Sequence, residues 1–410
     1  MNLHQPAKVL FLASSYPRSR DDTASVVLRY LAEHLADDGV DVHVLAPADR
    51  KGATVVEGKV TVHRFQYFPA ALQKLAYGSG MLPNLKRSPS LWLQVPFFFM
   101  VMTYSLLRLL ATQRFDLIHA HWILPQGLVG LIGPCLFRVP LVVSVHGTDA
   151  FALGGRFATS LKRLILSRSV AWTANTASTA AAVTRNSRLP HARIIPMGVD
   201  IALFSSGNPA ALRRELPEWE FLVLFVGRLI ENKGCHDLLQ SFSFLSSKTR
   251  SHTTLWVVGD GDQRKQLEQA AQDLGVGEKV RFFGTVNQQR LPEFYAAADL
   301  VAIPSRVGSL GETEGQAVVV LEAFAARACV VATAIGGIPS MVRDHVTGVL
   351  VAPGDSKALS SALEQLLDEP ALRRGFAEKA FTEVSEQYGW AHIASEFKTL
   401  YSEIVSPVRR

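Results

Sequence analysis

The sequence is poor in the features that mark secreted, zinc-binding or disordered proteins. Its three cysteines, Cys135, Cys235 and Cys329, are too few and too scattered for a disulfide framework or a zinc site. Charged residues make up 19% and hydrophobic residues 48% of the 410 residues, a balance typical of ordered globular proteins. The first apolar run, 9–13, is too short for the core of a signal peptide. We therefore expect a folded, cytoplasmic protein.

Long uncharged runs are also scarce, and the longest must be assessed as a possible membrane segment. Residues 91–107 carry no charge, but 17 residues with a glutamine and a proline lie at the lower limit for spanning a bilayer. The tryptophan and phenylalanines of this run, between Lys86, Arg87 and Arg108, are typical of a helix that lies in a membrane interface. A buried helix of the N-terminal domain is the alternative. We do not expect a membrane span.

Acidic residues are unevenly distributed between the two halves. Residues 1–205 hold 21 Lys and Arg against 11 Asp and Glu, a net charge of +10, whereas residues 206–410 hold 21 against 25, a net charge of −4. The basic half indicates an anionic partner, either the inner face of the cytoplasmic membrane, contacted peripherally, or a phosphorylated acceptor. Nucleic acid is not expected, because the chain has no recognition motif, RNP-like aromatic pattern or basic helix.

Both halves alternate short β-branched runs with helical patterns, which predicts two doubly wound α/β domains with parallel sheets. The expected strands are 9–13, 42–45, 60–65, 117–120, 141–145, 170–173 and 193–195, then 221–226, 255–258, 280–283, 300–303, 330–332 and 349–351. Proline- and glycine-containing segments at 196–200 and 205–209 indicate a linker. We expect domains at 1–198 and 199–388, with ligands at the carboxyl ends of the strands.

Three polar clusters follow strands of the second half. After the first strand, Gly227 and Arg228 precede Lys233 and a glycine that opens a helix, a combination suited to a phosphate. After the next strand, Gly259 and Asp260 begin the sequence Gly-Asp-Gly-Asp. Two carboxylates at this spacing can bind a divalent cation, but a glycine turn that caps the following helix is the preferred interpretation.

The third cluster ends in a pair of glutamates. Glu314 and Glu322 are eight residues apart, which predicts two carboxylates two helical turns apart, roughly 12 Å. Such pairs are usually surface residues, but the hydroxyls of a nucleotide sugar would suit them. The backbone N–H groups of Gly315, Gln316 and Ala317 at the predicted helix start would donate to phosphate.

In the first half, histidines follow two strands. His119 and His121 share one face of a strand, so that two ligands of one metal are conceivable; one packed histidine and one at a ligand site is the alternative. His146 and Gly147 follow the next strand. Arg18 and Arg20, after the first strand, are candidates for an acceptor phosphate, although loop arginines are more often solvated.

These motifs together resemble family 4 of the retaining glycosyltransferases, which have the GT-B fold, over essentially the whole chain. The resemblance is carried by FVGR and NKG within 225–234, the turn at 259–261, the run Tyr-Ala-Ala-Ala-Asp at 295–299, Pro-Ser at 304–305, E-x7-E, and Gly-Gly-Ile-Pro at 336–339. It implies two Rossmann-like domains facing across a cleft, and a C-terminal helix, 389–410, that packs back on the N-terminal domain.

The resemblance also implies roles for the residues already named. Arg228 and Lys233 would hold the diphosphate of the donor, Glu314 its sugar and Glu322 its ribose. His121 would lie near the C6 region of the sugar, with His146 and Gly147 on the next loop. No cofactor or metal is expected, and the β-phosphate would take the acceptor's proton during transfer with retention of configuration.

Four positions depart from the family pattern. Arg327 stands where the family commonly has Gly, Cys329 where it has Pro, and Ser340 where it has Glu, and the first loop, 16–25, lacks the usual Gly-Gly pair. These departures bear on fine geometry and on the donor sugar more than on the reaction class.

We therefore expect a metal-independent glycosyltransferase that moves a sugar from a nucleoside-diphosphate sugar to the hydroxyl of a lipid-linked or cell-envelope glycan acceptor, as in polysaccharide biosynthesis. The alternatives are a small soluble acceptor, or a catalytically silent nucleotide-sugar-binding protein. A dehydrogenase or epimerase would need Gly-x-Gly-x-x-Gly after the first strand, which the sequence lacks.

Overall fold

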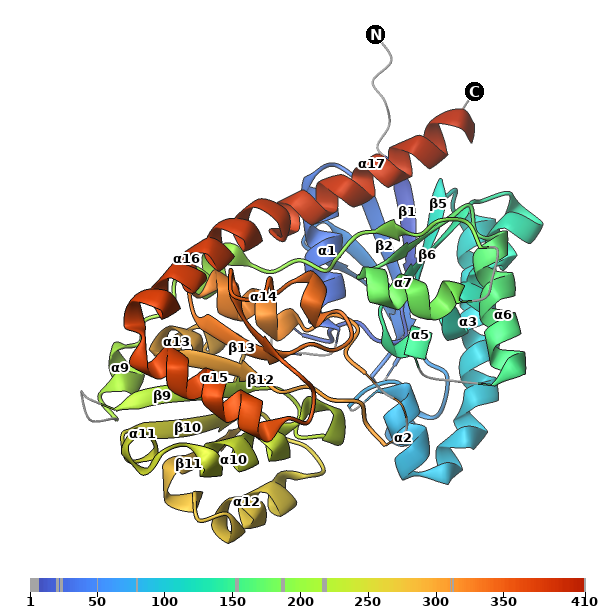
Figure 1. Ribbon diagram of the computed structural model, residues 1–410. Helices are drawn as coiled ribbons and strands as arrows, with labels where there is room; N and C mark the ends of the chain where they lie inside the picture. Colours follow the sequence, from blue (N-terminus) through green and yellow to red (C-terminus); the bar gives the residue numbers. More distant parts are fainter. Residues whose placement is uncertain are drawn as a thin grey trace. The chain divides into compact units, whose positions relative to one another are not determined.

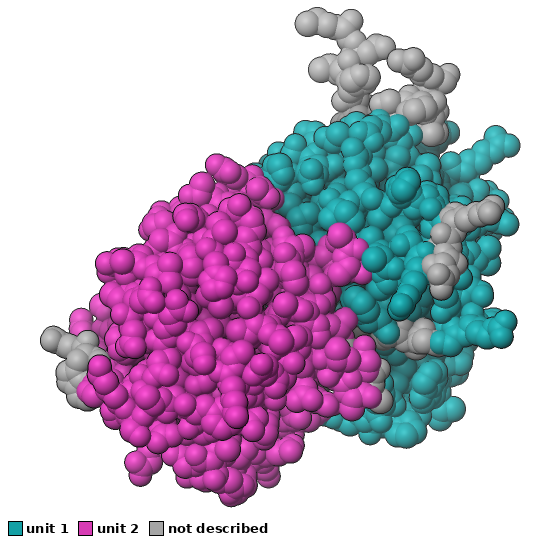
Figure 2. Space-filling model, viewed as in Figure 1, with its two compact units in different colours: residues 1–175, 179–196, 390–410 teal, residues 176–178, 197–389 magenta. Residues whose placement is uncertain are grey.

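The chain forms two compact units in a computed structural model (Figure 2). The model describes residues 7–19, 22, 25–49, 51–78, 80–151, 155–185, 189–215, 220–309, 311 and 313–408. Unit 1 consists of residues 1–175, 179–196 and 390–410, and unit 2 of residues 176–178 and 197–389. Unit 1 is thus discontinuous in sequence, because the last helix belongs to it.

Unit 1 is built on an eight-stranded sheet in the order β3-β4-β2-β1-β5-β6-β7-β8. The strands are β1 (Lys8–Leu12), β2 (Asp41–Pro47), β3 (Ala53–Glu57), β4 (Val60–Phe65), β5 (Leu117–His121), β6 (Leu141–Val145), β7 (Ala171–Ala174) and β8 (Arg193–Ile194). The pairings are parallel except for β3, which pairs antiparallel with β4. The central strands β1, β5 and β6 are almost wholly buried, as expected of parallel strands covered on both faces.

Helices cover this sheet (Figure 1). They are α1 (Val26–Asp37), α2 (Met81–Arg87), α3 (Gln94–Thr112), α4 (Leu128–Gly130), α5 (Thr148–Phe151), α6 (Arg156–Arg168), α7 (Ala177–Thr184) and α17 (Trp390–Val408), with short turns η1 (Ala70–Leu72), η2 (Pro89–Leu93), η3 (Ile123–Gly127) and η4 (Gly133–Phe137). Phe98, Met102, Leu106 and Leu110 form the buried stripe of α3, four residues apart, and join one apolar core with β5, β6 and α6.

A buried polar chain ties α17 to the middle of this sheet. His119 on β5 lies 2.7 Å from the hydroxyl of Tyr401 through Nδ1 and 2.7 Å from that of Ser144 through Nε2. Burial lowers the pKa of His119 to about 3, so the ring is neutral and donates one bond while accepting the other. Because hydroxyls occupy both ring nitrogens, His119 has none left for a metal, and the two-histidine metal hypothesis loses one ligand.

Unit 2 is built on a six-stranded parallel sheet in the order β11-β10-β9-β12-β13-β14. The strands are β9 (Phe221–Val226), β10 (Thr253–Val258), β11 (Val280–Gly284), β12 (Leu300–Ile303), β13 (Cys329–Thr333) and β14 (Gly348–Val351). The helices are α8 (Ile201–Ser205), α9 (Ala210–Arg213), α10 (Cys235–Phe244), α11 (Ser247–Ser251), α12 (Arg264–Asp273), α13 (Leu291–Ala297), α14 (Val318–Ala325), α15 (Ser356–Asp368) and α16 (Pro370–Gln387), with short turns η5 (Glu231–Lys233), η6 (Gly277–Lys279) and η7 (Ile338–Ser340).

Every strand expected from the sequence has a counterpart within a few residues, and two doubly wound α/β units are confirmed. The edge strand β3 is not among the expected strands. Its first four residues are exposed, including the apolar Val55 and Val56, so they show no alternation between a buried and a solvated face.

Replacing Tyr401 with Phe tests the buried polar chain. The substitution removes the hydroxyl and leaves Nδ1 of the buried His119 without its partner, which should lower the free energy of unfolding by about 1 to 3 kcal/mol. The control is Tyr388→Phe, whose hydroxyl lies 3.5 Å from the carbonyl oxygen of Ser340 in an exposed contact and should cost less than about 0.5 kcal/mol. Urea unfolding followed by circular dichroism measures both, and equal losses would show that the His119 contact contributes nothing.

Candidate functional site

The donor-side candidates from the sequence gather in unit 2, at the carboxyl edge of its sheet. Strand order reverses between β9 and β12, since β10 lies on one side of β9 and β12 on the other. Open α/β sheets bind ligands outside the carboxyl ends of the strands at such a switch point. The loops after β9, β10 and β12 carry all the donor-side candidates apart from Glu322, which lies on α14.

The loops after β9 and β10 run together through backbone hydrogen bonds. Gly227 N–H donates to the Val258 carbonyl at 3.0 Å, and Leu229 N–H donates to the Asp260 carbonyl at 3.0 Å. Arg228, between these two anchored positions, has an exposed side chain. These bonds thus fix the backbone on both sides of Arg228, whose guanidinium has the fork geometry that suits a phosphate.

Lys233 and Glu314, expected to contact different parts of one ligand, form an ion pair with each other. Lys233 Nζ lies 2.6 Å from Glu314 Oε2, and the Ser305 hydroxyl donates to the same oxygen at 3.3 Å. Both side chains are largely buried, with 20% and 10% exposed, so the pair is protected from solvent screening. A bound diphosphate would compete with Glu314 for the ammonium group.

Gly336 and Gly337 allow the loop after β13 to lie directly against the backbone of Glu314 and Gly315. A Cβ atom on Gly336, whose φ is +57°, would lie 1.9 Å from the Glu314 carbonyl oxygen, and one on Gly337 would lie 2.0 Å from that of Gly315. The N–H of Gly337 donates to the Glu314 carbonyl at 3.1 Å, and the Thr176 hydroxyl donates to the Gly315 carbonyl at 3.2 Å. These contacts set the position of Glu314.

The same contacts correct the prediction that Glu314 and Glu322 lie two turns apart on one helix. Helix α14 begins at Val318, so Glu314 lies in the loop before it. The carbonyl groups of Glu314 and Gly315 accept bonds from Gly337 and Thr176 instead of continuing a helix. The prediction was wrong because it treated the whole segment from Glu314 to Glu322 as helical, although Gly315 weakens a helix.

Helix α14 starts without a side-chain cap. Its N-cap residue, Ala317, offers no side-chain acceptor, and neither does Gly315. The Gln316 side chain turns away to the linker, where it accepts from the Met197 N–H at 2.8 Å and donates to the Met197 carbonyl at 3.0 Å. Gln316 therefore anchors the loop with its amide, and a role in donor binding stays a prediction for the backbone N–H groups of residues 315–317.

Glu322 lies one turn into α14 and is half-buried. The Tyr295 hydroxyl, from α13, donates to Glu322 Oε2 at 2.7 Å. Burial raises the pKa of the Glu322 carboxyl, and this hydrogen bond opposes the rise. Tyr295 was seen in the sequence only as part of a motif, because nothing in a sequence shows which buried tyrosine reaches a carboxylate.

In unit 1, β5 and β6 bring the other two predicted histidines together. His121 Nδ1 lies 3.1 Å from His146 Nε2, and His121 Nε2 is buried with no hydrogen-bond partner. Burial lowers the pKa of both rings, that of His146 to about 4. Both rings are therefore neutral near pH 7, and His121 retains one buried nitrogen that a ligand or water can satisfy.

Asp149 is a residue that sequence reasoning did not select, and it connects the loops after β5 and β6. Its carboxylate accepts from Ile123 N–H and His146 N–H, each at 3.0 Å. Burial raises its pKa to about 6, against the effect of these bonds. Its place two residues after Gly147, whose φ is +103°, was the available signal, since a carboxylate in the first turn after a strand-end glycine commonly fixes the loop.

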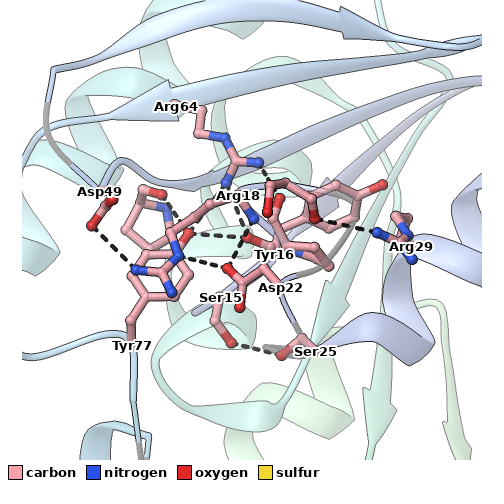
Figure 3. Close-up of polar contacts among 12 residues, drawn as sticks. Ser15, Tyr16, Arg18, Asp22, Ser25, Arg29, Asp49, Arg64 and Tyr77 are labelled. Atoms are coloured by element: carbon pink, nitrogen blue, oxygen red, sulfur yellow. Dashed lines mark hydrogen bonds and ion pairs between the residues drawn. The ribbon is translucent and has the colours of Figure 1, made fainter. Parts of the chain in front are cut away.

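Figure 3 shows the surroundings of Arg18, one of the two candidates for an acceptor phosphate. Its guanidinium pairs with Asp22 and Asp49 and lies over the Tyr77 ring, 4.6 Å from the centroid. Arg64 supports the same loop by donating to the Tyr16 carbonyl and the Tyr77 hydroxyl. An acceptor phosphate at Arg18 would have to compete with two carboxylates.

Two further expectations concern residues 20 and 260. Arg20 lies outside the described residues. Asp260 lies in a turn, with Oδ1 accepting from the Gly261 N–H at 2.7 Å. The expected capping of the following helix is wrong, because α12 has Gln263 as its N-cap residue and no side-chain hydrogen bond caps it. Among the residues that the structure describes, no three His, Cys, Asp or Glu side chains gather into a metal-binding group.

Comparison with known proteins agrees with this architecture. Residues 210–383 match the family model "Glycosyl transferases group 1", and residues 23–199 match "Glycosyl transferase 4-like domain". D-inositol 3-phosphate glycosyltransferase 2 of Catenulispora acidiphila is 30% identical over 316 residues, which are 72% of each chain.

Solved structures share the fold over almost the whole chain. Sucrose-phosphate synthase from Thermosynechococcus elongatus superposes with a TM-score of 0.80 at 22% identity, over 98% of this chain and 100% of that one. HepE of Anabaena, solved with UDP-glucose, gives 0.72 at 22% identity, over 98% and 99%. Two Rossmann-like units of this kind make up the GT-B fold. The chain belongs to the group 1 glycosyltransferases.

The structure accounts for one departure from the family pattern. Arg327 follows α14 with a φ of +57°, a left-handed conformation that glycine adopts without strain. Its guanidinium lies 3.6 Å from the centroid of the Phe381 ring and pairs with Glu378, contacts that a glycine would lack. Cys329 is buried in β13, and the Ser340 hydroxyl donates to the Gly337 carbonyl at 2.6 Å.

Replacing Gly336 with Ala tests the close packing of the loops. The new Cβ would collide with the Glu314 carbonyl oxygen, so the free energy of unfolding should fall by about 2 kcal/mol or more. Gly354→Ala is the matched control, because Gly354 also has a positive φ, +77°, but nothing lies within 4 Å of its Cβ position. That control should cost about 1 kcal/mol for conformation alone. Equal losses in urea unfolding would contradict the packing argument.

Proposed function

We propose that this glycosyltransferase transfers a hexose or related sugar from a nucleoside-diphosphate sugar to an acceptor hydroxyl, with retention of the anomeric configuration and without a metal ion. The observation that carries the proposal is the cluster at the switch point of unit 2. A phosphate-binding pair, Arg228 and Lys233, and two carboxylates, Glu314 and Glu322, follow adjacent strands of one sheet.

The charges of this cluster match the parts of a nucleotide sugar. Arg228 and Lys233 would neutralise the diphosphate and stabilise it as it leaves. Glu314, 2.6 Å from Lys233 in the ion pair, would accept from sugar hydroxyls close to that phosphate. Glu322, on α14, would accept from the ribose. The structure of HepE was solved with UDP-glucose, which agrees with a donor of this class.

In the proposed transfer, the bond between the sugar's anomeric carbon and the β-phosphate oxygen breaks as the acceptor oxygen forms the new bond on the same face. The acceptor's proton passes to an oxygen of the leaving β-phosphate. Positioning and charge stabilisation then supply most of the rate enhancement. Proton NMR of the first product formed in EDTA checks both statements: an inverted anomer, or no turnover without metal, would contradict them.

The neutral His121 is proposed as a contact of the donor sugar, next to His146 and Gly147. Its support is the buried Nε2 atom without a partner. This role needs residues of both units at one ligand and stays a prediction, as does the contact of Arg18 and Arg20 with an acceptor phosphate.

Nucleotide binding tests the donor site directly. UDP, GDP or ADP at about 100 times its dissociation constant should add about 2.7 kcal/mol to the stability of the wild-type protein. Glu322→Ala should lose most of that thermal shift, because it removes the acceptor proposed for the ribose. The nucleotide that stabilises the protein identifies the class of the donor. If none of the three stabilises the wild type, the proposed donor site is wrong, and so is the catalytically silent alternative, which also binds a nucleotide sugar.

We further propose that the acceptor is lipid-linked or part of a cell-envelope glycan, and that the enzyme contacts the cytoplasmic membrane peripherally through unit 1. Helix α3 supports this. Leu93, Phe97, Met100 and Tyr104 form an exposed stripe, four, three and four residues apart, opposite the stripe that packs on the sheet. Exposed apolar stripes of this kind mark an interaction surface.

Charge favours an anionic membrane as the partner of this stripe. Residues 58–115 contain seven Lys and Arg and no Asp or Glu. Pro89–Thr112 is also long and apolar enough to cross a bilayer, with a mean hydropathy of 1.6 and 22% of its apolar window buried. Because Phe98 and Met102 of this segment are in the core of unit 1, an interfacial position agrees with the fold and a span does not.

Vesicle sedimentation tests the membrane contact. The protein should bind vesicles that contain phosphatidylglycerol at low salt, and bind less to neutral vesicles and at high salt. Phe97→Ser should weaken binding about fivefold, the effect of losing roughly 1 kcal/mol of apolar transfer. Phe244→Ser in unit 2 is the matched control, because the two side chains are equally exposed, at 44% and 45%. Equal binding by both variants, or none by the wild type, would contradict the contact.

A small phosphorylated acceptor is the second candidate. It is favoured by the relative named D-inositol 3-phosphate glycosyltransferase 2, and the basic character of unit 1 suits a phosphate as well as a membrane. Transfer to inositol phosphate in solution, with no effect of vesicles on the rate, would favour it over the lipid-linked acceptor.

A further inference from the structure

We infer that Tyr295 is a positioning residue of the nucleotide site, whose hydroxyl holds the Glu322 carboxylate in the orientation that receives the ribose. The inference rests on the proposed function, and it assigns a role to a residue that makes no contact with the donor itself. It begins from one hydrogen bond between two helices of unit 2, 2.7 Å from the Tyr295 hydroxyl to Glu322 Oε2.

The two oxygens of Glu322 have different surroundings. Oε2 accepts from Tyr295, whereas within the described part of the chain Oε1 accepts no hydrogen bond. Glu322 is half-buried, and Oε1 is not among the fully buried polar atoms that lack a hydrogen-bond partner. One oxygen is therefore fixed by the protein, and the other is left to accept from hydroxyl groups of a ligand.

The Tyr295 ring is itself held rigidly. It is fully buried, and it meets the Phe204 ring edge to face with 5.7 Å between centroids. A tyrosine packed in this way has no freedom to follow a moving carboxylate, so its hydroxyl selects one rotamer of Glu322. Fixing the acceptor before the ligand arrives reduces the entropy lost on binding.

The hydroxyl also favours the ionised form of Glu322, because it donates to the carboxylate. Burial raises the pKa of Glu322 and also raises that of Tyr295 well above its usual value, so the tyrosine stays a donor. Two causes shift the pKa of Glu322: its burial and, among the described residues, the hydrogen bond from Tyr295. The other ionisable groups on elements packed against α14 are Asp200 before α8, Glu293 on α13, Cys329 on β13, and Arg373, Arg374, Glu378, Lys379, Glu383 and Glu386 on α16.

Replacing Tyr295 with Phe keeps the ring and removes the hydroxyl. We expect about tenfold weaker binding of the nucleoside diphosphate that stabilises the wild type, the effect of losing one hydrogen bond to a charged group. The carboxylate is the better acceptor for ribose, so affinity should fall as the pH drops through the pKa of Glu322. Without the hydroxyl that pKa is higher, and the fall should begin at a higher pH in the variant.

Calorimetric titration between pH 5.5 and 8, with the nucleotide and its 2′-deoxy and 3′-deoxy analogues, measures these effects. Preference for the ribonucleotide should shrink in Tyr295→Phe. Glu322→Gln should remove the part of the pH dependence that the carboxyl causes and leave the part due to ionisation of the nucleotide's terminal phosphate, whose pKa is about 6. Tyr401→Phe is the control, because it removes another buried, hydrogen-bonded tyrosine hydroxyl, in unit 1, and should keep wild-type affinity and pH profile.

The outcomes separate this inference from the function on which it depends. Wild-type binding with an unchanged pH profile and unchanged deoxy discrimination in Tyr295→Phe would overturn the role of Tyr295 alone. If Tyr295→Phe loses thermal stability but keeps the wild-type pH profile and deoxy discrimination, the hydroxyl acts only in packing. Absence of binding of UDP, GDP and ADP to the wild type would overturn both.

Discussion

Close contact between backbones at the carboxyl edge of unit 2 is the constraint on which the proposed donor site depends. The loop after β13 touches the carbonyl groups of Glu314 and Gly315, and the start of α10 at Gly234 approaches the Pro304 carbonyl just as closely, 1.9 Å from the position of a Cβ atom. No side chain fits in either contact. Glu314 and Lys233 are consequently anchored by backbone rather than by neighbouring side chains, and their 2.6 Å ion pair follows from that anchoring.

This arrangement explains why the ion pair and the ligand site can use the same groups. A buried charge without a partner is costly, so Lys233 and Glu314 neutralise each other while the site is empty. The diphosphate would replace Glu314 as the partner of the ammonium group, and sugar hydroxyls would replace the ammonium as the partner of Glu314. Exchange of partners avoids leaving either charge unpaired at any stage.

Much of the fold could be predicted, because apolar β-branched runs of four to six residues mark parallel strands directly. The strand β3 could not, since an exposed edge strand has no apolar pattern. The candidate residues after β9 and β12 could also be named, because glycine and charge follow the strand ends in sequence. Glu314 was assigned to a helix wrongly, and Asp149 and Tyr295 were not selected, because their partners are tertiary: two backbone N–H groups and a carboxylate 27 residues away.

The bond between His119 and Tyr401 joins residues 282 positions apart and has a consequence for the order of events during synthesis. At about 5 to 20 residues per second, a ribosome needs tens of seconds to make the intervening chain. For that interval β5 holds a histidine whose second hydroxyl partner does not yet exist, and the surface that α17 will cover stays uncovered. The half of the protein made first is thus completed last.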